Sequence, residues 1–222
     1  MCEKKTGHLI FPLSFQKHVN FFLKQQSYAY RITTFNKNKN YIDMIKALKL
    51  KEHQVRLLTL GLDNSGKTTI IKSLLGQDPT STSPTLGFTI NTLKYGQNTI
   101  NFWDIGGQTT IRSYWRNYFE ETDGVIWVVD SGDKLRLKDC KEELHNLLKQ
   151  EKLAGATLIV LCNKQDINGA LKVEEIKNLL ELESITSRHW MIMPCCGLTG
   201  DGLKEGLNWI MDDISSRIFM LG

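Results

Sequence analysis

Residues 61–68 read GLDNSGKT and have the spacing of a phosphate-binding loop, G-x-x-x-x-G-K-[ST]. An apolar run of β-type residues precedes this loop, and a stretch at 69–75 with helical apolar spacing follows it. In that context the backbone N–H groups of residues 63–68 can surround a β-phosphate at a helix N-terminus. Lys67 adds a point charge for the β- and γ-phosphates, and the Thr68 hydroxyl can ligate Mg²⁺.

A second segment, WDIGGQ at residues 103–108, carries groups that suit a γ-phosphate. Asp104 ends an apolar strand and can hold the water shell of Mg²⁺. The Gly107 N–H can reach a γ-phosphate without a side chain in the way, and Gln108 can orient the attacking water. An Asp-x-Gly-Gly sequence alone is also typical of a plain strand-to-helix turn. Beside a phosphate loop, it predicts a γ-phosphate sensor.

A third segment, NKQD at residues 163–166, follows a buried-strand pattern and predicts recognition of guanine. The Asp166 carboxylate can accept hydrogen bonds from N1–H and the 2-amino group together. Adenine lacks both donors, so binding it would leave the charge unpaired, which is costly. Lys164 can lay its stem over the base, and Asn163 can tie this loop to the phosphate loop.

Two further loops carry weaker signals. Gly197, in the sequence CCGL at 195–198, offers a backbone N–H that can meet guanine O6. Thr85 lies in the loop 84–88, and its hydroxyl can complete Mg²⁺ coordination when a γ-phosphate holds the loop closed. An ordinary connecting loop explains Thr85 equally well from the sequence alone.

Alternating strands and helices must position these loops. We predict strands at 55–61, 88–94, 98–104, 124–130, 157–163 and 190–194, and helices at 67–75, 110–120, 136–151, 172–182 and 203–218. The turn at 95–98 makes the second and third strands an antiparallel hairpin. The rest of the order predicts an α/β domain with a six-stranded, mostly parallel sheet and helices on both faces. Ligands should bind beyond the carboxyl ends of the strands.

Composition bounds the class of protein. The 222 residues carry a net charge of +4, but the first 40 hold seven Lys and Arg and one acid. The remainder then has 21 basic and 23 acidic residues, so we expect no nucleic-acid binding. The five cysteines show neither disulfide-framework nor zinc spacing, which indicates free thiols and a reducing compartment. No apolar run reaches the length needed to span a bilayer.

The N-terminal region differs in character from the rest. Residues 1–40 are basic and rich in Asn, Phe and Tyr, which is typical of a flexible tail or of sequence that does not belong to the mature protein. A mitochondrial presequence is the alternative, although Lys replaces the usual Arg. Residues 41–53 predict a short amphipathic helix, which could contact a membrane weakly or pack on the domain. We take 54–222 as the globular domain.

The strings GLDNSGKTT, SPTLGF, WDIGGQ, SYWRNYFEETDG, WVVDS, LAGATL, NKQD and DDISSRIF, spread over residues 41–222, resemble the ADP-ribosylation factor family of small GTPases. The resemblance implies a phosphate-loop GTPase fold that binds GTP or GDP and hydrolyses GTP slowly. It implies a water-positioning Gln108 and Mg²⁺ ligands at Thr68 and Thr85. The implied nucleotide contacts are Asp63, Asn64, Ser65, Gly66, Lys67, Thr68, Thr69, Asp104, Gly107, Asn163, Lys164, Asp166, Cys196 and Gly197.

The resemblance also implies partners. Phe88, Trp103 and Tyr118 would form an aromatic surface that effector proteins read, although their pattern alone favours core residues. Activating and exchange proteins would act on the switch. Tubulin-folding cofactor D and a prenyl-binding δ subunit that carries lipidated cargo would be further partners. The implied location is cytoplasmic, with a cytoskeletal, centrosomal or mitochondrial pool.

Three features depart from the family. The guanine loop has Cys196-Gly197 where the family has Ser-Ala or Cys-Ala, and backbone recognition should survive this change. Members begin with Met-Gly and many are myristoylated there. Here residue 2 is Cys2, so we expect no such modification at this start. The extra 40 residues at the N-terminus are also foreign to the family. Separately, the final residues 219–222 are not a C-a-a-X box, so we expect no Ras-type prenylation.

Three functions compete at this point. The leading hypothesis is a GTP-hydrolysing switch whose state depends on contacts made only by the γ-phosphate. A small-molecule kinase would need an arginine-rich lid, which the sequence does not show, and would not need the guanine segment. A nucleotide-bound scaffold for a folding or trafficking partner would depend little on turnover. No arginine occupies an evident position for stabilising the negative charge of the transition state, so intrinsic GTP hydrolysis should be slow.

Overall fold

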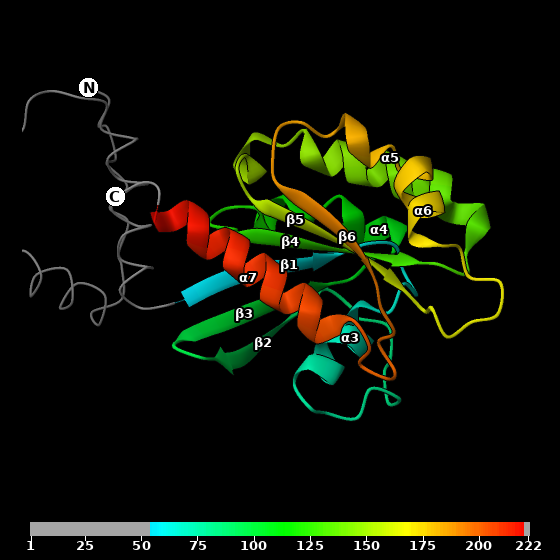
Figure 1. The fold of residues 1–222 in the computed structure, drawn as a ribbon, viewed down its shortest axis with the longest axis horizontal. Coiled ribbons are helices and arrows are strands. Elements are labelled where there is room, and N and C mark those ends of the chain that lie inside the picture. Colours follow the sequence, from blue (N-terminus) through cyan, green and yellow to red (C-terminus); the bar gives the residue numbers. More distant parts are fainter. Residues whose placement is uncertain (1–53, 220–222) are drawn as a thin grey trace, which may run out of the picture. The chain divides into compact units, whose positions relative to one another are not determined.

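The computed structural model describes residues 54–219, in which six strands form one sheet (Figure 1). The order across the sheet is β2-β3-β1-β4-β5-β6, and only the pair β2–β3 is antiparallel. This confirms the predicted mixed sheet. The strands are β1 (Gln54–Leu60), β2 (Phe88–Tyr95), β3 (Asn98–Ile105), β4 (Gly124–Asp130), β5 (Thr157–Asn163) and β6 (Trp190–Pro194). The predicted tail at 1–40 and helix at 41–53 lie outside the described residues.

Helices cover both faces of the sheet (Figure 1). The α-helices are α3 (Lys67–Leu74), α4 (Thr109–Arg112), α5 (Leu137–Leu148), α6 (Val173–Leu179) and α7 (Leu203–Phe219). One core cluster joins the sheet to α5 and α6, and a second joins the opposite face to α3 and α7. The strand β5 is therefore buried along its whole length, as expected for a central parallel strand.

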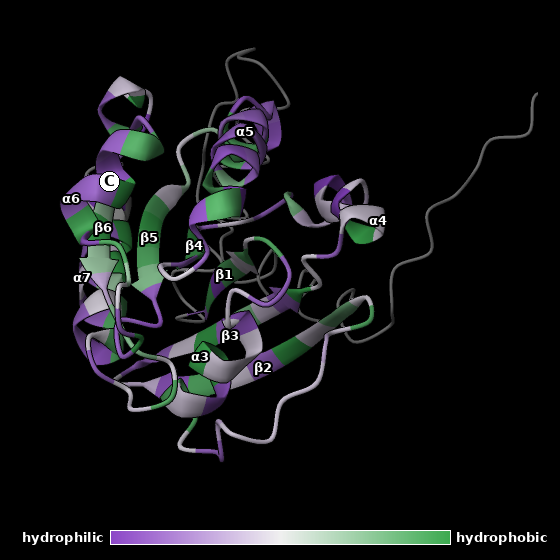
Figure 2. Cartoon of the chain, turned by 90° about the vertical axis from the view of Figure 1, so that its right-hand side faces the viewer, coloured by the Kyte–Doolittle hydropathy of each residue, from purple (hydrophilic) through white to green (hydrophobic). Residues whose placement is uncertain are grey.

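Alternation along the strands builds these two cores. Leu58 and Trp127 belong to the cluster under α5, whereas their chain neighbours Leu57 and Val128 belong to the cluster under α7. Figure 2 shows hydrophobic residues along β5 and hydrophilic residues over much of α5. No helix within residues 54–219 is both long and apolar enough to cross a membrane.

The antiparallel hairpin forms as predicted. Tyr95 pairs with Asn98 across a two-residue turn in which Gly96 has a φ of +58°. At the end of β2 the Tyr95 hydroxyl donates a hydrogen bond to Asn208 of α7. The tip of the hairpin is thus fastened to the C-terminal helix.

The predicted continuous helix at 110–120 is wrong. The helix α4 has only four residues, and a separate 3₁₀ helix follows at Trp115–Tyr118. The buried Trp115 donates its indole N–H to the Gly106 carbonyl at 2.9 Å, which draws this turn back onto the end of β3. Threonine, serine and asparagine are poor helix formers, so this tertiary contact prevails over the weak local preference.

Two other predicted helices are shorter than expected, whereas α3 and α7 agree with their predicted bounds to within one residue. The stretch predicted as 136–151 is α5 with 3₁₀ turns at Lys134–Arg136 and Glu151–Leu153. The stretch predicted as 172–182 is α6, followed by a 3₁₀ turn at Leu182–Ser184.

Candidate functional site

The phosphate-binding loop connects β1 to α3 at the carboxyl edge of the sheet. Gly66 stands at the start of α3 with a φ of +93°, a conformation that side-chain-bearing residues rarely adopt. A Cβ atom on Gly66 would lie 2.2 Å from the Asn163 amide nitrogen. Only glycine therefore lets the phosphate loop and the loop after β5 approach this closely.

Lys67 is buried within this loop. Its ammonium group donates hydrogen bonds to the carbonyls of Leu62 at 2.7 Å and Gly61 at 3.2 Å. Burial lowers the pKa of Lys67 to about 8, although the nearby carboxylates of Asp104 and Asp63 act in the opposite direction. An anion placed in the loop would stabilise the charged form of this amine.

Three predicted residues from separate segments of the chain meet beside Lys67. The Thr68 hydroxyl donates to the Asp104 carboxylate at 2.6 Å and lies 2.9 Å from the Thr85 hydroxyl. Thr85 also donates to Asp104, at 3.3 Å. The structure thus brings the loop at 84–88 against the phosphate loop, and its Thr85 is not an unattached surface residue.

This group of three fits Mg²⁺. All the side-chain ligands are oxygens, which Mg²⁺ prefers, and the ion commonly keeps several waters of its own. Asp104 is fully buried, and its Oδ1 atom has no hydrogen-bond partner. Burial raises the pKa of Asp104 despite hydrogen bonds from Thr68 and Thr85 and the charge of Lys67. A cation or its water shell would supply both the missing partner and the missing charge.

Gly107 packs directly onto the phosphate loop. A Cβ atom at this position would lie 2.4 Å from the Gly61 carbonyl oxygen and 2.5 Å from the Asp63 nitrogen. The next residue, Gln108, has extended backbone geometry and begins α4, its carbonyl accepting from the Ile111 N–H at 2.8 Å. The predicted γ-phosphate sensor therefore lies beside the predicted phosphate cradle.

Asn163 joins the guanine segment to two other loops. Its amide donates to the Ser65 carbonyl at 2.9 Å, and its Oδ1 accepts the Gly197 N–H at 2.8 Å. The first of these hydrogen bonds is the predicted tie to the phosphate loop. Because the Gly197 N–H already has a partner here, its contact with guanine O6 stays a prediction.

The two charged residues of the guanine segment are also held in place. The Cys196 thiol donates to the exposed Asp166 carboxylate at 3.1 Å, and Lys164 forms an ion pair with Asp130 at 2.6 Å. A cavity of about 260 Å³ opens between these loops and α3. It is lined by Gly66, Thr69, Asn163, Lys164, Asp166, Ile167, Cys196, Gly197 and Leu198.

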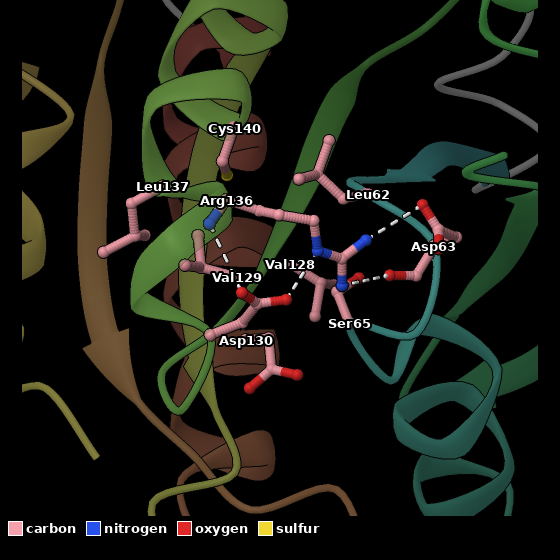
Figure 3. A pocket seen from close by; sticks show the side chains of 10 residues that line it. Leu62, Asp63, Ser65, Val128, Val129, Asp130, Arg136, Leu137 and Cys140 are labelled. Carbon is pink, nitrogen blue, oxygen red and sulfur yellow. Dashed lines mark hydrogen bonds and ion pairs between the residues drawn. The ribbon is translucent and has the colours of Figure 1, made fainter. Parts of the chain in front are cut away.

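Two arginines that contact the phosphate loop were not predicted from the sequence, and Figure 3 shows one of them, Arg136, beside Asp63. Arg136 donates to the Asp63 carboxylate at 3.1 Å and to its carbonyl at 3.3 Å, and Arg112 reaches the same carboxylate oxygen at 3.4 Å. Arg112 also donates to the Gly107 carbonyl at 2.8 Å and pairs with Glu143 of α5 at 3.1 Å. These contacts link the phosphate loop to α4 and α5. Their sequence signal is slight: one arginine four residues after Gln108, and one following a polar turn.

The aromatic residues Phe88, Trp103 and Tyr118 form a partly exposed cluster. Their ring centroids lie 5.0–5.9 Å apart, and Phe88 stacks on Trp103 with an interplanar angle of 11°. Phe88 is 43% exposed, whereas Trp103 and Tyr118 are half-buried against the core under α5. The group is therefore at the boundary of the core, with one face open to solvent.

Known proteins resemble this chain strongly. A model of the ADP-ribosylation factor family matches residues 41–214. ADP-ribosylation factor-like protein 2 of Arabidopsis thaliana is 58% identical over 181 residues, covering 81% of this chain and 98% of that protein. The Dictyostelium discoideum protein of that name is 55% identical over 180 residues, again covering 81% and 98%. The Arl6 BBS3 small GTPase of Trypanosoma brucei, solved with the nucleotide analogue GppNp, superposes with a TM-score of 0.68 at 33% identity, covering 73% of this chain and 98% of its own.

Proposed function

This chain belongs to the ADP-ribosylation factor family and is a small GTPase, and from this premise we propose that it is a switch set by the γ-phosphate of GTP. The observation that carries the proposal is the meeting of Thr68 at the start of α3, Asp104 at the end of β3 and Thr85 in the loop before β2. A bound triphosphate would stabilise this closed arrangement further, because Thr68 and Thr85 could then hold the Mg²⁺ that accompanies it.

In this proposal residues 63–69 hold the α- and β-phosphates through backbone N–H groups, and Lys67 neutralises the β- and γ-oxygens. Thr68 and Thr85 would hold Mg²⁺, with Asp104 binding its water shell. The metal, when bound, neutralises charge on the phosphate oxygens. The Gly107 N–H binds the γ-phosphate, and Gln108 orients the attacking water. The arginine pair supports slow intrinsic turnover, since Asp63 already engages both guanidinium groups.

The base is recognised by the loops after β5 and β6. Asp166 reads N1–H and the 2-amino group, Lys164 covers the base, and Asn163 couples base to phosphates through Ser65. Cys196 and Gly197 complete the pocket. This part of the proposal argues against the small-molecule kinase, because specific guanine recognition has no role there.

We further propose the partners that the family suggests. Effector proteins would contact Phe88, Trp103 and Tyr118, while activating and exchange proteins control the nucleotide. Similarity to factor-like protein 2 favours tubulin-folding cofactor D and the prenyl-binding δ subunit, hence roles in microtubule assembly and lipidated-cargo trafficking. The corresponding location is cytoplasmic with a cytoskeletal, centrosomal or mitochondrial pool.

We propose that residues 54–222 form the GTPase domain, that residues 41–53 form a helix that could touch membranes, and that residues 1–40 are an extension.

The metal-ligand assignment is tested with Thr85→Ala, using Thr82→Ala in the same loop as a matched control. We expect Thr85→Ala to weaken binding of a non-hydrolysable GTP analogue in Mg²⁺ about tenfold, with GDP affinity nearly unchanged. The control should bind both nucleotides as the wild type does. Equal losses for GDP and the GTP analogue would contradict the switch assignment. GTPase rates with and without an activating protein would separate a switch from a nucleotide-bound scaffold.

A further inference from the structure

Arg56 of β1 lies against the aromatic cluster, and neither the motifs nor the proposed nucleotide chemistry uses it. The guanidinium carbon of Arg56 is 3.8 Å from the centroid of the Trp103 ring. The strand β3, which carries Trp103, lies between β1 and β2 in the sheet (Figure 1). Arg56 from β1 and Phe88 from β2 therefore approach Trp103 from opposite sides. The indole is held between a cation and an aromatic ring.

The position is an unusual one for an arginine. Residues Leu58 and Trp103 face one another across the β1–β3 pair, and Leu58 is fully buried in the core under α5. Arg56 is two residues earlier on the same face of β1 and is partly buried. Its Nε atom has no hydrogen-bond partner and is shielded from solvent. Burial lowers the pKa of Arg56, which the nearby carboxylates of Glu121, Asp123 and Glu120 oppose in that order.

One hydrogen bond fixes the guanidinium of Arg56, and a second one fixes the backbone of the same residue. Its Nη2 atom donates to the Tyr118 carbonyl at 2.9 Å, which ties it to the second aromatic residue of the cluster. The Arg56 backbone N–H donates to the Asp123 carboxylate at 2.8 Å. The flat guanidinium can stack on an indole and donate in its own plane at the same time, which an ammonium group cannot do. One side chain thus contacts both Trp103 and the turn that carries Tyr118.

We propose that Arg56 is a positioning residue for the aromatic surface formed by Phe88, Trp103 and Tyr118. Arg56 fixes the orientation of the Trp103 ring and ties the turn that carries Tyr118 to that ring. The surface therefore presents one fixed arrangement to a partner. This inference rests on the proposed role of that surface as an effector contact. Arg56 touches none of the loops assigned to the nucleotide, so its effect should be confined to the aromatic surface.

The test compares Arg56→Met and Arg56→Lys with Arg116→Met, in which an exposed arginine of the Trp115–Tyr118 turn loses the same charge. Each variant is also made with Trp103→Phe, so that the Trp103 share of the fluorescence is obtained by difference among the five tryptophans. Acrylamide quenching and near-ultraviolet circular dichroism of the GDP-loaded proteins report the environment of this ring. GDP affinity and melting temperature are measured alongside.

We expect Arg56→Met to raise the quenching constant of Trp103 about twofold and to reduce its dichroic signal, since one face of the ring is uncovered. The Trp103 quenching constant of Arg56→Lys should lie between those of Arg56→Met and the wild type, and that of Arg116→Met should equal the wild-type value. GDP affinity should change less than about threefold. An unchanged Trp103 signal in Arg56→Met, or an equal change in Arg116→Met, would overturn the inference. Failure of the wild type to bind GDP would instead count against the proposed function, and the quenching of Trp103 would then be compared among the nucleotide-free proteins.

Discussion

Base specificity is a property of one carboxylate in the proposed site. Asp166 is exposed, and the only hydrogen bond within residues 54–219 that we find on it comes from the Cys196 thiol at Oδ1. That bond orients the carboxylate and leaves acceptor positions for a base. In the proposed site two donors on guanine would pair with this one carboxylate, so an amide at this position would reverse the preference between bases.

Asp166→Asn should therefore weaken GTP binding about tenfold to a hundredfold, because hydrogen bonds to a charged acceptor are lost. Binding of xanthosine triphosphate should improve, since the amide can donate to the additional carbonyl of xanthine. Competition binding with both nucleotides measures the change, and Asp212→Asn on the exposed side of α7 serves as the control. An unaltered GTP preference would remove Asp166 from the base site.

The lowered pKa of Lys67 predicts how the free energy of unfolding depends on pH when no nucleotide is bound. Its pKa in the folded protein is about 8, below the ordinary value of 10.5, because the amine is buried. Between these values the unfolded chain binds more protons than the folded one, so this group makes stability rise as the pH increases from about 8 to 10.5.

Urea unfolding of the nucleotide-free protein across this pH range measures the effect. Lys67→Met removes the titrating group and should flatten that part of the profile. Bound nucleotide should flatten it as well, because phosphate oxygens stabilise the charged amine. A rise that persists unchanged in Lys67→Met would assign it to another residue.

At the scale of elements, the arginine pair shows what a single sequence cannot reveal. Arg112 and Arg136 meet at Asp63 although they lie 49 and 73 residues away from it along the chain. Arg112 donates a hydrogen bond to the Gly107 carbonyl and forms an ion pair with Glu143 of α5. The short helix α4, which has no fully buried residue, is attached through this side chain and through Ile111, which packs against the core under α5.

Arg112→Met should loosen α4 and speed GDP release about three- to tenfold, as expected for the loss of charge-assisted hydrogen bonds at a largely buried side chain. Release of a fluorescent GDP analogue in stopped flow measures the rate, with Arg116→Met as the exposed control in the next turn. The melting temperature should fall only slightly, because both hydrophobic cores are untouched. Identical release rates in the two variants would mean that Arg112 does not restrain the phosphate loop.

Elements with strong patterns were predictable, and those with weak patterns were not. All six strands lie within one or two residues of their predicted bounds, because apolar runs between polar loops leave few alternatives. The predicted helix at 110–120 failed because its residues have little helical preference and Trp115 is drawn to Gly106. Most motif residues of the proposed site stand where a parallel strand ends, which is why their positions could be predicted, whereas Thr85 in the loop before β2 could not be told from an ordinary loop residue. The contact of Arg56 with Trp103 and the contacts of the two arginines with Asp63 could not be predicted, since they depend on side chains from separate elements.

At the scale of the whole molecule, one sheet organises the phosphate, metal and base loops along a single edge. The order β2-β3-β1-β4-β5-β6 places β1 beside both β3 and β4, so the phosphate loop adjoins Asp104 on one side and the arginine turn on the other. The two core clusters lie on opposite faces and both include β1, β4 and β5. The proposed nucleotide site at this edge is thus supported by both of these cores.

These considerations predict that the N-terminal extension is dispensable for nucleotide chemistry. Every residue of the proposed site lies at or beyond Gly61, and both described cores are built from residues after Gln54. The composition of residues 1–40, basic and without sustained periodicity, does not suggest that it supplies core side chains. A protein beginning at Asn40 should fold, bind GTP with the affinity of the full chain, and keep its melting temperature. Its association with lipid vesicles could differ, because the predicted amphipathic helix at 41–53 would then begin the chain. Calorimetry, nucleotide binding and vesicle sedimentation on both proteins test this, and an insoluble or nucleotide-free truncated protein would show that the extension packs on the domain.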